Sequence, residues 1–397
     1  MPDFVAEAKA LLPQVVALRR RIHEQPELGL ENPVTAALIE EQLQGLDVAI
    51  ARSKATSGLV VSLAGWRPGK TILLRGDTDA LPMSEDTGLP FKSRIDGRMH
   101  ACGHDAHTAM LVYAVRLLHG HRDAFAGTVK FMFQPGEEGF HGARYMIDEG
   151  LIDGDPKPDA AFALHIIPNI RASTFAGKAG PIMGSADAWH MIVKGRGGHA
   201  SAPQDAVDPM PVAFEIGLAL QNMVTRRHSV FDPVVVTVAH VTGGTTNNVI
   251  PEAVAIEGTL RAISPGARQA AQENIARVMK HVAAAHLCTA EITFKEGYPV
   301  TQNDAGFFDF AREVAREVAG DGGFTQMAAP LMGAEDFSYV LQRIPGVMFV
   351  LGVMPERRDP STPVAPVHSN RMMLNEDAMA AGIAMHAAIA TRFLAGA

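Results

Sequence analysis

The sequence has little of several features that would assign it to other classes of protein. It contains only two cysteines, Cys102 and Cys288, among 397 residues, so a secreted domain held together by disulfide bonds is excluded. Its basic residues form no run longer than the triplet at 19–21, and 43 acidic residues outnumber 35 basic ones. Phosphate binding requires a clustered positive surface, so we expect no nucleic-acid partner.

The sequence also shows no segment typical of a secretory signal or of a membrane span. Charged residues at Asp3, Glu7 and Lys9 interrupt the first segment, so it has no apolar core of a secretory signal. The longest uncharged apolar tract, 378–391, contains His386 and is shorter than the roughly 20 residues that span a bilayer. We therefore expect a cytoplasmic protein with no membrane contact.

The first part of the chain alternates between segments typical of strands and of helices. A chain of this length exceeds one ordinary core, so two domains are expected. The rhythm predicts an α/β domain with a mostly parallel sheet, in which reactive residues follow the carboxyl ends of the strands. The opening helix is expected at 3–23, strands at 59–65, 71–77, 128–133 and 160–165, and helices at 107–119 and 141–149.

The middle of the chain follows a different order. Strands are expected at 189–194, 234–240, 253–260 and 291–295, and helices at 209–224 and 267–286. This β-α-β-β-α-β order is that of a ferredoxin-like unit. The αβ rhythm then returns, with helices at 307–318 and 335–342, a strand at 346–352 and a final helix from Glu376. The interpretation is a catalytic domain at 1–185 and 297–397 with an inserted domain at 186–296.

Four segments bring metal-binding side chains to the edge of the predicted sheet. Together they offer a thiolate, imidazoles and carboxylates, which suit zinc or ions from manganese to nickel. Five such ligands exceed the three that hold one catalytic zinc, so a pair of metals is the better fit. The segments are HACGHDAH (100–107) with Cys102 and His104, FQPGEEG (133–139), His165 at the end of its strand, and PVHSN (366–370) with His368.

The adjacent carboxylates Glu137 and Glu138 make chemical sense beside metal ions. One can coordinate metal while its neighbour takes a proton from water and returns it to the leaving amine. Without a cation the two would repel, and one would be driven to protonate. Each feature alone has an ordinary structural interpretation: Cys102 as a small buried side chain and the glutamates as solvated loop residues. Their coincidence at one sheet edge favours a metal site.

Three other functions compete with a metal centre. The segment Gly195–Ala200 fits a dinucleotide-binding pattern, but Pro203 interrupts the helix that should follow and the expected acidic residue is absent. The sequence has no G-x-S-x-G of a serine hydrolase and no H-E-x-x-H of a single-zinc protease. A catalytically inactive metal-binding protein would not need to keep both glutamates.

Six motifs in one order give the chain a family resemblance. They are HACGHD, FQPGEEG, GRGGHAS, GGTTNNVIP, GTLRA and GAEDFSY. In this order, over roughly His23 to His368, the chain resembles the hippurate hydrolase and auxin-conjugate amidohydrolase branch of the dinuclear metallopeptidases. The resemblance implies a zinc-peptidase-like α/β domain with a ferredoxin-like lid, and hydrolysis of the amide bond of N-acyl amino acids. It also implies Glu137 as general base and, as metal ligands, Cys102, His104, Glu138, His165 and His368.

The resemblance assigns roles to the inserted domain as well. His199 would polarise the scissile carbonyl, and Asn248 and Arg261 would hold the substrate's carboxylate, which suits an arginine fork. Asp79, in a further matching motif, would orient a ligand imidazole. Relatives dimerise through the lid, so a homodimer or higher homo-oligomer is expected, and His199 can act in its own subunit or across the dimer. A dipeptidase or aminopeptidase of the same dinuclear class is the alternative.

Some positions depart from the family pattern. Gln204 stands where relatives often have histidine, Phe140 and His141 replace part of a glycine run, and Ser369-Asn370 follows His368 instead of a proline-containing form. None is an expected ligand, but all bear on the substrate pocket. The sequence predicts neither the acyl group nor which of manganese, zinc, cobalt or nickel is bound.

Overall fold

The computed structural model describes residues 2–356 and 361–396, and the chain divides into two units. The large unit comprises Met1–Ile182, Gln302–Ala329 and Asp336–Ala397, and the small unit comprises Met183–Thr301 and Pro330–Glu335. The unit boundaries thus fall at 182/183 and 301/302, where the sequence led us to expect 185/186 and 296/297. The short segment Pro330–Glu335 belongs to the small unit by its contacts, which the sequence pattern did not indicate.

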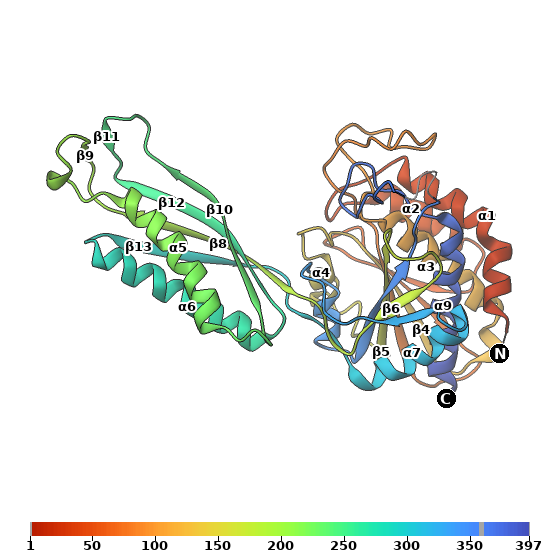
Figure 1. The fold of residues 1–397 in the computed structure, drawn as a ribbon. Helices are drawn as coiled ribbons and strands as arrows, with labels where there is room; N and C mark the ends of the chain where they lie inside the picture. The colour runs from red at the N-terminus through yellow and green to blue at the C-terminus, as the bar shows by residue number, and fades with distance from the viewer. Residues whose placement is uncertain (1, 357–360, 397) are drawn as a thin grey trace. The chain divides into compact units, whose positions relative to one another are not determined.

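The large unit is built on an eight-stranded sheet among the described residues (Figure 1). Its order is β1-β2-β4-β3-β5-β16-β6-β15, with β4, β3, β5 and β16 parallel at the centre and β2 and β6 antiparallel to their inner neighbours. The predicted mostly parallel sheet is confirmed. The strands are β1 (Ala49–Arg52), β2 (Leu59–Ala64), β3 (Thr71–Asp77), β4 (Thr128–Gln134), β5 (Ala160–Ile167), β6 (Phe175–Gly177), β15 (Phe324–Gln326) and β16 (Gly346–Gly352).

The central strands of this sheet are buried over their whole length because helices cover the sheet. The helix α3 packs on β3 and also contacts α1 and α9, which makes the main hydrophobic core of the unit. The helix α1 begins where the side chain of Asp3 accepts a hydrogen bond from the Ala6 amide at 3.0 Å. The helices are α1 (Phe4–His23), α2 (Pro33–Leu43), α3 (His104–Gly120), α4 (Gly142–Asp148), α7 (Ala305–Ala319), α8 (Ser338–Leu341) and α9 (Met379–Ala395), with short turns η1 (Arg122–Ala124) and η3 (Glu376–Ala378).

The structure corrects three details of the large unit. The helix α3 starts at His104, three residues before the predicted start, and β5 runs to Ile167, so His165 lies inside the strand. The helix predicted from Glu335 begins only at Ser338. Asp336 precedes it because its carboxylate accepts a hydrogen bond from the Ala143 amide at 3.0 Å, which holds this residue in a loop.

The tract judged too short to span a bilayer lies in a longer apolar helical segment than expected. Glu376–Ala395 covers 20 residues and is long and apolar enough to cross a membrane, with a mean hydropathy of 1.4 over an 18-residue window. However, 72% of that window is buried inside the unit, where α9 packs against α1, α3 and α7. Its apolar character is accounted for by the core that it fills.

The small unit has the predicted β-α-β-β-α-β order and an antiparallel sheet β10-β12-β8-β13. The helices α5 and α6 cover one face, around a core that includes Trp189, Ile216 and Ile275. Residues on the other face of β12 are half-exposed or exposed in alternation with buried ones. The elements are β8 (Ser185–Lys194), β9 (Gly198–His199), η2 (Pro203–Asp205), α5 (Pro209–Arg227), β10 (Val234–Gly243), β11 (Val249–Ile250), β12 (Ala253–Ala262), α6 (Pro265–Ala285) and β13 (Thr289–Glu296).

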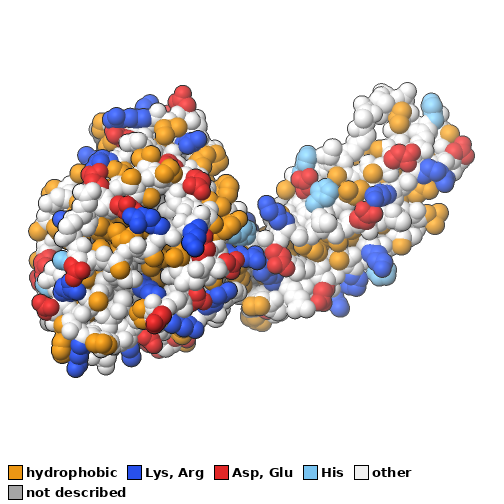
Figure 2. Space-filling view, turned by 180° about the vertical axis from the view of Figure 1, so that it is seen from behind, with side chains coloured by type: hydrophobic (Ala, Val, Ile, Leu, Met, Phe, Trp, Pro, Cys, Tyr) orange, Lys and Arg blue, Asp and Glu red, His pale blue; other side chains and the backbone are white. Residues whose placement is uncertain are grey.

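Two further short strands, β7 (Gly180–Met183) and β14 (Thr301–Asn303), pair where the chain passes from one unit to the other. Figure 2 shows acidic and basic side chains interspersed over the face in view. Such a mixture produces no extended field of one sign on that face.

Candidate metal centre

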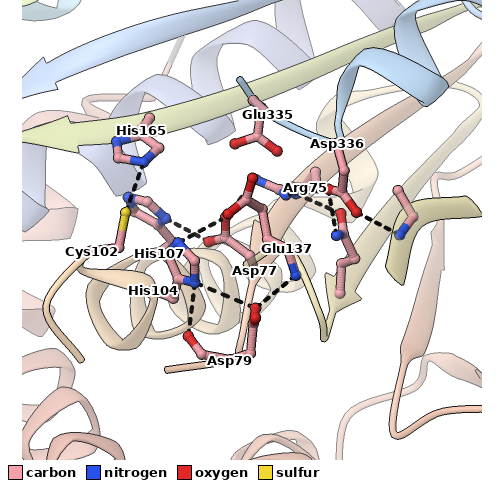
Figure 3. Close-up of polar contacts among 12 residues, drawn as sticks. Arg75, Asp77, Asp79, Cys102, His104, His107, Glu137, His165, Glu335 and Asp336 are labelled. Atoms are coloured by element: carbon pink, nitrogen blue, oxygen red, sulfur yellow. Dashed lines mark hydrogen bonds and ion pairs between the residues drawn. The ribbon is translucent and has the colours of Figure 1, made fainter. Parts of the chain in front are cut away.

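The four segments with metal-binding side chains all lie in the large unit. The segment 100–104 leads into α3, the loop 135–141 follows β4, His165 is near the end of β5, and His368 lies between β16 and α9. The carboxyl ends of the parallel strands β4, β3 and β5 meet at one edge of the sheet, as expected for a reactive site. Figure 3 shows Cys102, His104 and His165 turned toward one another at this edge.

Cys102 belongs to two groups of ligand atoms. It joins His104 and His165 in one group and Glu138 and His368 in the other, and the ligand atoms of each group lie within 4.8 Å of one another. Cys102 Sγ is 3.4 Å from His165 Nε2, and His368 Nε2 is 3.1 Å from Glu138 Oε1. Sulfur and nitrogen atoms on one tetrahedral zinc stand about 3.5 Å apart, given bonds of about 2.3 and 2.1 Å. Each group has a spacing that fits side chains able to hold a cation, and Cys102 belongs to both groups.

Glycine at position 103 allows Cys102 and His104 to point to the same place. Gly103 has φ +88° and caps the N-terminus of α3. A Cβ atom there would also lie 2.5 Å from the side chain of Ile166. Both the left-handed backbone and the close approach of β5 therefore require glycine between the two ligands.

In His104 and His165, a hydrogen bond made by Nδ1 leaves Nε2 as the nitrogen that a metal could bind. His104 Nδ1 donates to the main-chain oxygen of Asp79 at 2.8 Å, and its Nε2 is buried with no hydrogen-bond partner among the described residues. His165 Nδ1 donates to the main-chain oxygen of Ile166 at 2.8 Å, which leaves Nε2 as the lone-pair atom facing Cys102. His165 Nε2 lies 3.4 Å from Cys102 Sγ and His104 Nε2 lies 3.5 Å from Asp77 Oδ2, so both buried nitrogens stand among the donor atoms that a cation would bind.

The electrostatics of the cluster also favour a cation. Burial lowers the pKa of His165 to about 3, so this ring is neutral, and burial raises the pKa of the Cys102 thiol. Hydrogen bonds to Cys102 and Glu138 raise the pKa of His368 to about 10. Burial opposes ionisation of Glu138, but its bond to His368 and the charge of His104 outweigh burial and lower its pKa. In the protein alone His368 supplies the positive charge that a divalent ion would supply between the same atoms.

The carboxylate of Asp79 holds the loop with the two glutamates. Its Oδ1 accepts from the Glu137 amide and its Oδ2 from the Glu138 amide, both at 3.0 Å. The sequence led us to expect this carboxylate on a ligand imidazole. It lies 3.5 Å from His104 Nδ1, whose shorter bond goes to the main-chain oxygen of Asp79. Glu137 is 6% exposed, and its carboxylate lies in one group with His104 and Glu138.

A buried network beneath the cluster was not found from the sequence. Arg75 Nη1 donates to Asp77 at 2.6 Å, and its Nη2 donates to Asp336 at 3.1 Å. Gln134 Nε2 donates to the same oxygen of Asp336 at 2.7 Å. Asp77 in turn accepts from His107 Nδ1 at 2.6 Å. The available signal was an arginine inside the apolar strand β3, where a charge must be paired.

The remaining predicted site residues lie in the small unit. His199 and Asn248 are exposed and adjacent: His199 pairs with Val249 across β9 and β11, and the Ala200 amide donates to the Asn248 carbonyl at 3.1 Å. Arg261 is half-buried near the end of β12, beside Val235 and Ala186 on the neighbouring strands. Thus the structure brings the five candidate ligands, Glu137 and Asp79 together in one unit, and His199 and Asn248 together in the other, with Arg261 apart from that pair.

Comparison with known proteins assigns the chain to a family. A family model described as peptidase family M20/M25/M40 matches residues 73–392. The chain belongs to this family. Members hydrolyse amide bonds with bound metal, so this chain is a metal-dependent amidohydrolase, and its resemblance to the hippurate hydrolase and auxin-conjugate amidohydrolase branch is confirmed.

Three similar proteins illustrate the match. An IAA-amino acid hydrolase ILR1-like 2 of Arabidopsis thaliana is 37% identical over 98% of this chain and 87% of its own length. An N-acetylcysteine deacetylase of Bacillus subtilis is 38% identical over 87% of this chain and 89% of its own length. The crystal structure of the Bacillus subtilis YXEP protein, described as a dinuclear metal-binding peptidase from the M20 family, is 33% identical and superposes with a TM-score of 0.84, covering 98% of this chain and 99% of that one.

Proposed function

We propose that the chain hydrolyses the amide bond of N-acyl amino acids with two divalent ions and Glu137 as general base. The observation that carries this proposal is the overlap of two ligand groups at Cys102, with the buried Glu137 beside them. Relatives that act on IAA-amino acid conjugates and on N-acetylcysteine support an N-acyl amino acid as substrate. The ions would be manganese, zinc, cobalt or nickel, and the cytoplasm would be the location.

The metal ligands in this proposal are Cys102, His104, Glu138, His165 and His368. Two bound ions would polarise the substrate carbonyl and make a water molecule more acidic. Glu137 is suited to act as the base for two reasons. Its amide donates a hydrogen bond to the Asp79 carboxylate at 3.0 Å, which holds its main chain, and its own carboxylate has no assigned role as a metal ligand. It would accept the water's proton and deliver it to the amine nitrogen that leaves. Asp79 would act as a positioning residue for Glu137 and Glu138 alike.

Arg261 is suited to bind the α-carboxylate of the substrate. No hydrogen bond or ion pair joins its guanidinium to another described residue, and burial lowers its pKa. Its cross-strand neighbours, Val235 and Ala186, are uncharged, and the nearby Asp187 is bound by Arg268 at 2.8 Å. A half-buried, unpaired guanidinium beside apolar side chains requires an anion, and a carboxylate matches its fork.

His199 is suited to polarise the scissile carbonyl. Its Nδ1 accepts from the Ser201 amide at 3.1 Å, so the proton of the neutral ring is on the exposed Nε2, where it can be donated to a carbonyl oxygen. Asn248 adds an amide next to it.

The spacing within the small unit supports action of His199 across a dimer. Along β12, Arg261 pairs with Ala186 near the start of β8, and Ala253 at the other end pairs with Lys194. His199 lies beyond Lys194, on β9 (Figure 1). Eight residues of strand separate the two ends by roughly 26 Å, at about 3.3 Å per residue. One small substrate cannot contact both ends of a single lid, so Arg261 of one subunit and His199 of the other would meet at each site. The assembly would be a homodimer formed through the lid.

The alternative is a dipeptidase or aminopeptidase of the same metal class, which the described activity of the YXEP protein supports. A panel of N-acyl amino acids and of dipeptides with a free amine, assayed with manganese, zinc, cobalt and nickel, separates the two. We expect turnover of N-acyl amino acids, its loss on dialysis against a chelator and its return with a divalent ion. Faster cleavage of free-amine dipeptides would favour the alternative, and full activity of protein shown to be metal-free by elemental analysis would refute both.

A further inference from the structure

His107 lies between two candidate metal ligands, and its ligand atom falls within 4.8 Å of those of Asp77 and His104. Its ring is stacked on His104 with centroids 5.5 Å apart and meets the edge of His165 with centroids 4.9 Å apart (Figure 3). Both of its ring nitrogens already have protein partners. Nδ1 donates to Asp77 Oδ1 at 2.6 Å, and Nε2 accepts from the main-chain amide of Ile166 at 2.9 Å. The ring is 2% exposed.

The hydrogen bonds of His107 to Asp77 and Ile166 connect β3 to β5 beyond the point where their main-chain hydrogen bonds end. The parallel pairing of the two strands ends at Arg75 and Ala163, before the residues of the site. Past that point Asp77, the last residue of β3, binds His107, and His107 binds Ile166 on β5. The buried amide of Ile166 would otherwise have no partner on this side of β5, and a buried amide without a hydrogen bond is destabilising.

Ile166 is next to the ligand His165 and shapes its position through both of its main-chain groups. The Ile166 amide belongs to the peptide that follows His165, and His107 holds it. The Ile166 carbonyl accepts from His165 Nδ1 at 2.8 Å and fixes the ring rotation. The side chain of Ile166 also approaches Gly103, between the ligands Cys102 and His104.

Asp77 is itself held rigidly. Arg75 donates to its Oδ2 at 2.6 Å, and Thr108 donates to its main-chain oxygen at 2.7 Å. Because the Ile166 amide donates to His107 Nε2, the proton of the neutral ring is on Nδ1, from which it is donated to Asp77.

We propose that His107 is a positioning residue that sets the metal affinity of the ion held by Cys102, His104 and His165, by bonding the Ile166 amide from Asp77. The ion held by Cys102, Glu138 and His368 depends on it less, because neither Glu138 nor His368 is bonded to this link. The inference rests on the proposed metal centre and not on the proposed substrate.

Two substitutions separate the two bonds of His107. His107→Gln places an amide oxygen near the position of Nε2 and can still accept from Ile166. His107→Asn places its amide near Nδ1 and keeps only the bond to Asp77. Cobalt binding to the full-length metal-free protein is measured in chelator-buffered titrations, from the thiolate-to-cobalt charge-transfer band. We expect His107→Asn to weaken one of two bound equivalents about 10- to 100-fold and His107→Gln to weaken it less, because Gln keeps the bond to Ile166 and loses only the one to Asp77.

His386→Gln is the matched control for lost stability. His386 is also buried and packs edge-on against Phe162 of the same strand, with ring centroids 5.5 Å apart, but it has no bond to the end of β5. Its thermal midpoint should fall while both cobalt affinities remain those of wild type. Equal weakening in His107→Asn and His107→Gln, or weakening in neither, would overturn the proposal.

A measurement on the wild-type chain covers the case in which a variant does not fold. With ¹⁵N-labelled histidine, His107 should be the Nδ1–H tautomer in both metal-free and metal-loaded protein. An Nε2–H tautomer would contradict the proposal, because that nitrogen could not accept from Ile166. If wild type binds no metal at all, the proposed function fails; if it binds two ions and the variants behave alike, only this inference fails.

Discussion

The metal-binding edge of the large unit and the His199 end of the small unit differ in how firmly their side chains are held. At the edge, His104 and His165 each have one nitrogen bonded to main-chain oxygen at 2.8 Å, and both are enclosed by other residues. In the small unit, His199 and Asn248 are exposed, and their side chains bond only to Ser201 and Thr246 among the described residues, two positions away in sequence.

This difference indicates what each region requires to function. The large unit places its ligand atoms in advance, so cations complete a prearranged cluster. The small unit has a donor and an unpaired cation that no described residue of the same unit engages together. In the proposed function, its residues would gain a role when a substrate and a second copy of the chain are present.

The largest effect should come from the base in the prearranged region. We expect Glu137→Gln to keep its metals and lose roughly 10²–10⁴ in turnover, the usual weight of general base catalysis. Metal content by elemental analysis and kcat are measured together. Glu138→Gln is the comparison and should lose metal, because Glu138 is bonded to His368 at 3.1 Å. If Glu137→Gln instead loses metal and regains turnover when refilled, the two roles are exchanged.

The region that needs a second copy can be tested by mixing two inactive proteins. If His199 acts across the dimer, Glu137→Gln and His199→Ala form mixed dimers with one intact site. At equal amounts and free subunit exchange, activity should approach about a quarter of wild type. As a control, Glu137→Gln mixed with His165→Ala should stay inactive, since both changes lie in the large unit. Failure of the first mixture to recover, with exchange verified, would place His199 in its own subunit.

A smaller effect is expected at Arg261, whose partner in the proposed function is the carboxylate of the substrate. Substrates with an amidated α-carboxylate should lose about 1–3 kcal/mol in kcat/KM, because the guanidinium is left unpaired. In Arg261→Ala the acid and amide forms should become similar. Equal rates of wild type on both forms would remove Arg261 from the site.

The smallest effect concerns how the stability of the large unit depends on pH. Burial lowers the pKa of His386 to about 3, and its Nδ1 has no hydrogen-bond partner among the described residues. Because the folded pKa lies below the unfolded value of about 6.5, the unfolded chain binds a proton first as the pH falls. Wild type should therefore lose stability by up to about 1.4 kcal/mol per pH unit below pH 6.5, and His386→Leu should lose less. Parallel stability curves for the two proteins in urea, between pH 7 and pH 5, would contradict this assignment.

Local pattern was sufficient for much of the fold. The β-α-β-β-α-β order of the small unit and the parallel centre of the large sheet follow from the apolar periodicity, and the structure has both. The pattern missed short elements such as β6 and β15, whose three residues each carry too little periodicity. It also predicted the start of α3 too late. The helix begins at His104, which is buried, and its hydrogen-bond partner, the main-chain oxygen of Asp79, is distant in sequence.

For the site, the sequence by itself determined which chemistry is available: a thiolate, imidazoles and paired carboxylates in segments that end near one sheet edge. Only the tertiary structure decided which atoms face each other. Asp79 binds two amides through its carboxylate and an imidazole through its main chain, and His107 joins Asp77 to Ile166 instead of a metal. The distance along β12 between Arg261 and the His199 end depends likewise on strand pairing. Hydrogen-bond partners and strand register are set by residues distant in the chain, which no local pattern contains.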